Sequence, residues 1–246
     1  MKKLLILLLC SSALFAQKTG AIYYTETMKL QLPDGPDNEA FRQLMPTSRD
    51  MFKVLYYNEN ESLFRNEQGK NEDLEIRHEE DGNDFEMIFG VPETNVYTNL
   101  KNNQLLQYQE FMGKEFLIVD KLNTRKWKLD AKQKKVLGFD CQKATLIDTT
   151  QQVIAWFTPQ IPISVGPNGY SGLPGMVLAI EVDNGQRMLT ATKMEDLPAG
   201  FAFEKPSEGK KVNRNEFEKI RDEKMKEMGA KRGAGGNVMM IIEERD

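Results

Sequence analysis

Short apolar segments that alternate with polar positions dominate most of the chain. Residues 21–32 alternate in this way and are rich in strand-forming residues. Residues 51–57 and 62–65 have the same character and flank a polar Asn-Glu-Asn-Glu sequence, which predicts a hairpin. Residues 69–83 are strongly charged and rich in turn-forming residues, so we expect a solvated acidic loop there.

From residue 84 onward, apolar segments of a few residues follow one another closely, separated by turn-forming sequences. These segments are 85–89, 94–100, 104–112, 114–119, 126–129, 136–138, 140–147 and 152–157. The gaps are too short for the helices that βαβ units need. The pattern therefore predicts a mainly β protein with a curved antiparallel sheet or an open barrel.

The clearest hairpin pairs residues 176–182 with 188–194, across an Asn184-Gly185 sequence that favours a type I′ turn. Four alternating apolar side chains predict the core side of its first strand: Met176, Leu178, Ile180 and Val182.

The C-terminal part has a different composition. Asn213 and Glu216 have the spacing of a capping box, which predicts a helix that ends near Met228. Its apolar stripe is thin, so we expect it to pack loosely or to protrude. Residues 229–236 are a glycine-rich linker, and the apolar segment 238–242 either closes the sheet as a last strand or docks on another chain.

The N-terminus has the layout of a secretory signal peptide. Lys2 and Lys3 precede an apolar run that falls short of the roughly 20 residues of a membrane-spanning helix, and small residues precede Gln17. The sequence predicts an exported protein of the periplasm or the periplasmic face of the outer membrane, with no transmembrane span in the mature chain. The predicted parts are a signal peptide (1–16), an antiparallel β domain (17–197) and a C-terminal extension (198–246).

The net charge and the cysteine content exclude some classes of partner and of covalent cross-link. The net charge of −4 is spread over both signs without a basic stripe, which argues against nucleic acid as a partner. After removal of the signal peptide, Cys141 is the only cysteine, so no internal disulfide forms. Its neighbours in the sequence are apolar, which predicts a buried cysteine in the core.

The sequence contains few residues in arrangements typical of catalysis or metal binding. His78, the only histidine, lies in the charged segment far along the chain from Cys141, which disfavours a Cys–His site. Glu79 and Glu80 follow it, but adjacent side chains diverge in an extended chain, and no zinc signature is present. Four methionines offer thioether ligands for reduced copper, although methionine also fills irregular apolar contacts: Met225, Met228, Met239 and Met240. We expect no enzymatic activity, no cofactor and no metal site.

Residues 158–175 form a loop with four prolines and four glycines, which leaves little room for a regular element. Residues 166–169 and 173–176 both predict tight turns. The second has Pro174 and Gly175 at the central positions of a type II turn.

This loop has two alternative roles. It packs against the end of the sheet as a plug through Tyr170, Leu173 and Pro174, or it exposes Tyr170 and Ile161 as a binding surface. The plug is favoured, because tight turns with apolar tips usually serve packing. For the binding role, the candidate residues are Tyr170, Leu173, Pro174, Gly175 and Met176.

The loop also carries a resemblance to a known family. Gly172-Leu-Pro-Gly175, together with Trp127 and the segments 138–144 and 155–157, resembles the GLPGLI family of exported proteins from Bacteroidetes-type bacteria. Methionine and valine stand where the family motif has leucine and isoleucine, and the resemblance covers about residues 120–183. The function of that family is not established, so the resemblance implies export but no catalytic residues.

Two functions fit these features. The first is a non-enzymatic accessory protein of the cell envelope that binds another envelope or outer-membrane protein through the loop or the C-terminal tail. The alternative is a carrier or chaperone that holds a lipid or another apolar ligand in the concave face of the sheet. A metal-handling or thiol-reactive protein is a third, weaker class.

Overall fold

The computed structural model describes residues 18–30, 44–80, 83–122, 125–147 and 151–227. The predicted signal peptide, the glycine-rich linker and the apolar C-terminal segment lie outside the described residues.

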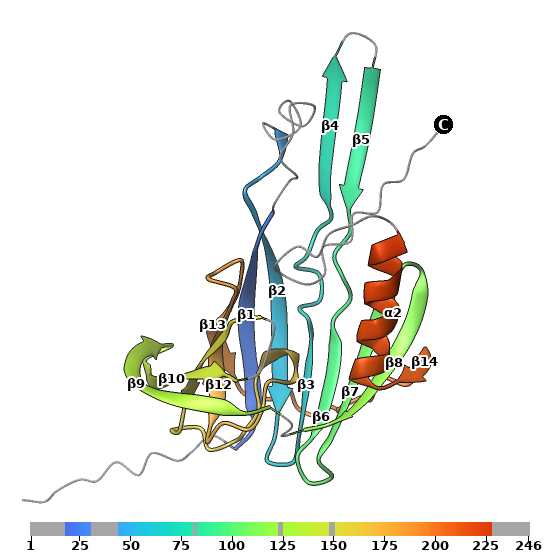
Figure 1. The fold of residues 1–246 in the computed structure, drawn as a ribbon. Coiled ribbons are helices and arrows are strands. Elements are labelled where there is room, and N and C mark those ends of the chain that lie inside the picture. Colours follow the sequence, from blue (N-terminus) through green and yellow to red (C-terminus); the bar gives the residue numbers. More distant parts are fainter. Residues whose placement is uncertain (1–17, 31–43, 81–82, 123–124, 148–150, 228–246) are drawn as a thin grey trace, which may run out of the picture.

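One open sheet organises the described part of the chain (Figure 1). It has twelve strands in the order β14-β8-β7-β6-β3-β2-β1-β13-β12-β11-β10-β9. Neighbouring strands are antiparallel except for β14 and β8, which are parallel. The strands of this sheet are β1 (Gly20–Lys29), β2 (Ser48–Tyr57), β3 (Glu61–Asn66), β6 (Asn95–Asn99), β7 (Gln104–Phe111), β8 (Lys114–Lys121), β9 (Trp127–Val136), β10 (Phe139–Leu146), β11 (Val153–Thr158), β12 (Met176–Val182), β13 (Arg187–Glu195) and β14 (Lys210–Val212). The prediction of a mainly β protein with a curved antiparallel sheet is confirmed.

The sheet curls around one core. Phe64 and Leu105, on β3 and β7, belong to the same buried apolar cluster as Ala155 and Leu178, on β11 and β12. These strand pairs are several positions apart in the sheet, so they share one core because the sheet bends back on itself. We call the face that carries these side chains the inner face and the opposite one the outer face.

Two predicted hairpins are confirmed. β2 and β3 pair across Asn58, whose side chain accepts hydrogen bonds from the N–H groups of Asn60 and Glu61. β12 and β13 pair across a turn in which Asp183 and Asn184 have φ values of +48° and +55°. Gly185 also has a positive φ, +82°, and the N–H of Gln186 donates to Asp183 O at 3.3 Å, so the predicted Asn184-Gly185 turn lies at the centre of the connection.

Residues 198–227 of the C-terminal extension are part of the fold. Residues 198–209 cross the outer face, where the ring of Phe201 stacks on Tyr56 at a centroid distance of 4.1 Å. β14 then pairs with β8, and helix α2 (Arg214–Glu227) begins.

The predicted capping box is present, because the N–H groups and side chains of Asn213 and Glu216 exchange two hydrogen bonds of 2.9 Å. Phe217 is only 2% exposed and packs edge-on against Phe111 and Phe116. The helix is therefore docked on β8, although its thin apolar stripe predicts loose packing. The buried ring of Phe217 thus holds the helix against the sheet, although the rest of the apolar stripe is thin.

Two predictions of irregular structure are wrong. The charged stretch predicted as an acidic loop contains β4 (Leu74–Glu80), which forms a separate two-stranded sheet with β5 (Asn83–Phe89). The charged side chains of this stretch are compatible with a strand because they pair across the hairpin. Arg77 lies directly opposite Glu86, and their side chains form an ion pair at 2.8 Å. The charged residues 130–135 likewise continue β9, an exposed strand at one edge of the large sheet. Lysines are common on such edges because they discourage pairing with other chains.

Candidate functional site

The loop 158–175 lies against the inner face. Its 3-10 helix η2 (Pro167–Gly169) contacts β3 and β6. Ile161, Val165 and Leu173 are buried in the central core. This arrangement matches the predicted plug, and it fills the region of the inner face where a carrier would need an apolar cavity.

The five candidate binding residues of this loop differ in their surroundings. Leu173, Gly175 and Met176 are buried, Tyr170 is half-buried and Pro174 is exposed. The turn is also tighter than the predicted type II turn. Gly175 N–H donates to Leu173 O at 2.8 Å, and Met176 N–H donates to Ile161 O at 3.0 Å instead of closing a four-residue turn. Of these five residues, a partner would reach only Tyr170 and Pro174 without unfolding the loop.

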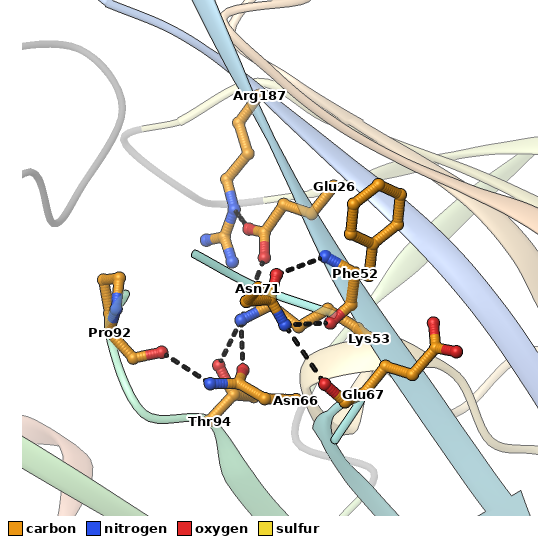
Figure 2. Close-up of polar contacts among 9 residues, drawn as sticks. All are labelled: Glu26, Phe52, Lys53, Asn66, Glu67, Asn71, Pro92, Thr94 and Arg187. Carbon is orange, nitrogen blue, oxygen red and sulfur yellow. Dashed lines mark hydrogen bonds and ion pairs between the residues drawn. The ribbon is translucent and has the colours of Figure 1, made fainter. Parts of the chain in front are cut away.

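A buried ion network lies on the inner face beyond the loop (Figure 2). Glu26 of β1 accepts a hydrogen bond from Arg187 of β13 and lies 3.7 Å from the ammonium of Lys53 on β2. Lys53 Nζ also donates to Asn66 Oδ1 at 2.5 Å and to Thr94 Oγ1 at 2.9 Å. The side chains of Glu26 and Lys53 are 2% and 1% exposed. The network therefore ties four strands, β1, β2, β3 and β13, and the segment before β6 together.

Sequence analysis did not identify this network, although the alternation of β1 contains a signal for it. Glu26 occupies an inward position between Tyr24 and Met28, which are both buried. A charged side chain at an inward strand position needs a partner, because an unpaired buried charge is very costly.

Burial lowers the pKa of Lys53 to about 8, and the opposing charge of Glu26 limits the shift. Because the unfolded chain binds a proton at Lys53 up to about pH 10.5, unfolding takes up a proton between pH 8 and pH 10.5. The stability of the protein therefore rises with pH across this window. We expect wild type to gain about 2 kcal/mol relative to Lys53→Met between pH 7.5 and pH 10. Urea unfolding of both proteins across this pH range measures the difference, and parallel profiles would contradict the shift.

Cys141 is buried in the central core, as predicted. Its thiol lies 3.7 Å from Phe139 O, and burial raises its pKa to about 11. The thiolate that nucleophilic chemistry requires is therefore disfavoured. Among the described residues, no group of three or more His, Cys, Asp or Glu side chains is arranged to hold a metal ion.

The β4–β5 hairpin projects beyond the twelve-stranded sheet (Figure 1), and polar contacts fix its base. Arg49 of β2 donates to Phe89 O at 2.9 Å, to Gly90 O at 3.2 Å and to Glu72 O at 2.6 Å. Asp73 accepts a hydrogen bond from the N–H of Val91 at 3.0 Å. One guanidinium thus bridges the strand that enters the hairpin and the strand that leaves it.

Nearby, Asn71 exchanges two hydrogen bonds with the backbone of Phe52, at 2.7 and 2.9 Å (Figure 2). The segment that leads into β4 is therefore held against β2. In the hairpin itself, Glu75, Arg77 and Glu86 are exposed, and Ile88 is 40% exposed. The hairpin thus presents these four side chains to solvent, whereas Ile76 and Phe89 near its base are buried.

This fold defines a class of mainly β protein: one open, curled antiparallel sheet with a loop plugging its inner face. In the part of the chain that the structure describes, no helix has both the length and the apolar character to cross a membrane.

Comparisons with known proteins show a similarity in one segment of the chain and a similarity in fold. Residues 147–179, which include most of the plug loop, match the model of a family described as "Protein of unknown function (Porph_ging)". No curated protein matches the chain. Two solved structures of PNGF-II, in space groups P21 and C2, share its fold, with TM-scores of 0.53 and 0.51 and sequence identities of 17% and 18%. The matched region covers 82% of this chain but only 33% and 32% of the PNGF-II chains.

Proposed function

We propose that this protein is a non-enzymatic protein of the cell envelope that binds another envelope protein through the β4–β5 hairpin. The projecting hairpin with its fixed base is the observation that carries the proposal. An isolated two-stranded ribbon is only marginally stable in water, yet Arg49 and Asp73 hold this one in place. A rigid arm of this kind lowers the conformational cost of binding.

The charge and the edges of the hairpin indicate the kind of partner. Residues 72–86 contain eight Asp or Glu residues and one Arg, so the arm is strongly acidic. β4 and β5 pair only with each other in the described structure, so each has one open edge. A partner with a basic surface fits this arm, and an extended segment of that partner adds to an open edge by main-chain hydrogen bonds.

The test is a shortened hairpin in an otherwise intact chain. Leu74 and Phe89 pair directly across the hairpin, so an Asn-Gly turn joins them when residues 75–88 are removed. This variant keeps the backbone acceptors of Arg49 at Glu72, Phe89 and Gly90. Deletion of residues 229–246 is the matched control, because it removes the other candidate docking segment.

Native mass spectrometry of each protein, purified gently from its own envelope fraction, is the measurement. We expect a stoichiometric protein partner on wild type and on the tail deletion, and none on the shortened hairpin, whose unfolding in urea stays cooperative. Raised salt weakens this complex, because the contact is electrostatic. Loss of the partner only on tail deletion overturns the hairpin as the docking site. A retained mass in the lipid range favours the carrier alternative, and the absence of any bound mass contradicts both.

A further inference from the structure

A small cavity of about 90 Å³ lies on the inner face, between the plug loop and the start of α2. Its wall combines apolar and small residues with three cationic side chains and one acidic side chain. The lining residues are Leu105, Leu122, Gly169, Ser171, Asp120, Lys121, Arg125 and Arg214. The cavity therefore carries a net positive charge.

Arg125 is held in place by the plug loop. Its Nη1 donates to Gly169 O at 2.9 Å, and its guanidinium lies 4.2 Å from the centroid of the Tyr170 ring. Trp127 donates to Ser171 O at 2.9 Å and packs against the same ring. The loop thus fixes the position and the plane of the guanidinium before any ligand arrives.

Arg214 reaches the cavity from the first turn of α2. Its Nη2 donates to Gln107 Oε1 at 2.5 Å, whereas its Nε lies 3.9 Å from Asp120 Oδ2, a distance too long for a hydrogen bond. Burial lowers the pKa of both arginines, and the charge of Arg125 lowers the pKa of Arg214 further. The two guanidinium groups therefore repel each other, and the nearby carboxylate compensates them only partly.

We propose that this cavity binds the oxyanion group of a small ligand, a carboxylate or a phosphate. Each guanidinium has five N–H donors in a planar fork. In the described structure, each arginine makes one hydrogen bond to a protein acceptor, so most of its donors remain for a ligand. A cavity of this size admits a group of a few non-hydrogen atoms. An anion between the two arginines relieves their repulsion and forms charge-assisted hydrogen bonds with both.

The full chain is titrated with sodium phosphate and with sodium acetate by isothermal titration calorimetry, with sodium chloride holding the ionic strength constant. We expect saturable binding at one site, and the anion that binds distinguishes a phosphate ligand from a carboxylate ligand. Arg125→Gln and Arg214→Gln are each expected to weaken binding about tenfold or more. Arg221→Gln is the control, because Arg221 lies on the same helix and its described partner is Asp222, outside the cavity.

Arg125→Lys keeps the charge but loses the fork, so we expect weaker binding with the fold intact even if a glutamine variant fails to fold. The proposal is overturned if neither anion binds above the chloride background, or if the Arg125 and Arg214 variants bind as wild type does. The shortened-hairpin variant is expected to keep its anion affinity, so this site and the proposed docking arm are tested separately.

Discussion

Gly175→Ala is expected to destabilise the protein by more than about 4 kcal/mol, or to prevent folding. Gly175 has a φ of +152°, a conformation that residues with a Cβ rarely adopt. A Cβ at this position would lie 2.1 Å from Thr158 O and 2.7 Å from Thr158 C, which are backbone atoms of the strand that leads into the loop. The clash therefore cannot be relieved by a rotamer change. Urea unfolding of the purified variant, or its absence from the soluble fraction, measures the effect.

Gly138→Ala is the matched control for this substitution. Gly138 also has a positive φ, +81°, but nothing lies within 4 Å of a Cβ built there. Its replacement is expected to cost only about 1 kcal/mol, from the backbone conformation alone. Similar losses at the two glycines would show that the close approach of the loop to Thr158 contributes little.

Glu26→Met is expected to destabilise the protein by about 3–5 kcal/mol. The substitution leaves Lys53 buried with only the neutral acceptors Asn66 and Thr94, because Glu26 is the carboxylate that faces its ammonium. The loss of Glu26 costs less at Arg187, because its side chain is 27% exposed and reaches water. The free energy of unfolding in urea measures the loss.

The double variant Glu26→Met/Lys53→Met separates the charge effect from packing. It replaces both buried charges by apolar side chains of similar length, so we expect it to recover most of the lost stability. Glu59→Met is the surface control, because Glu59 pairs with Lys18 at 2.8 Å where both side chains are more than half exposed. We expect this control to change stability by less than about 1 kcal/mol. A double variant as unstable as Glu26→Met alone would refute the account of an unpaired Lys53 charge.

Local pattern in the sequence determined much of this protein. Period-two alternation located β1, β2, β3 and the β12–β13 hairpin. The Asn213–Glu216 spacing located the start of α2, since a capping box acts within a single turn. The apolar neighbours of Cys141 predicted its burial in the same way. Each of these features depends on residues that are close together along the chain, so the sequence alone was enough to find them.

Only the tertiary structure decided which strands meet. The β4–β5 hairpin was missed because its charged residues become strand-compatible through cross-strand pairs such as Arg77 with Glu86. The register of β1 against β2 brings Glu26 beside Lys53, and the fold brings Arg125 and Arg214 to the wall of one cavity. These pairs are far apart in the sequence, and a side chain's partner across a curled sheet depends on strand order and register, which local periodicity does not specify.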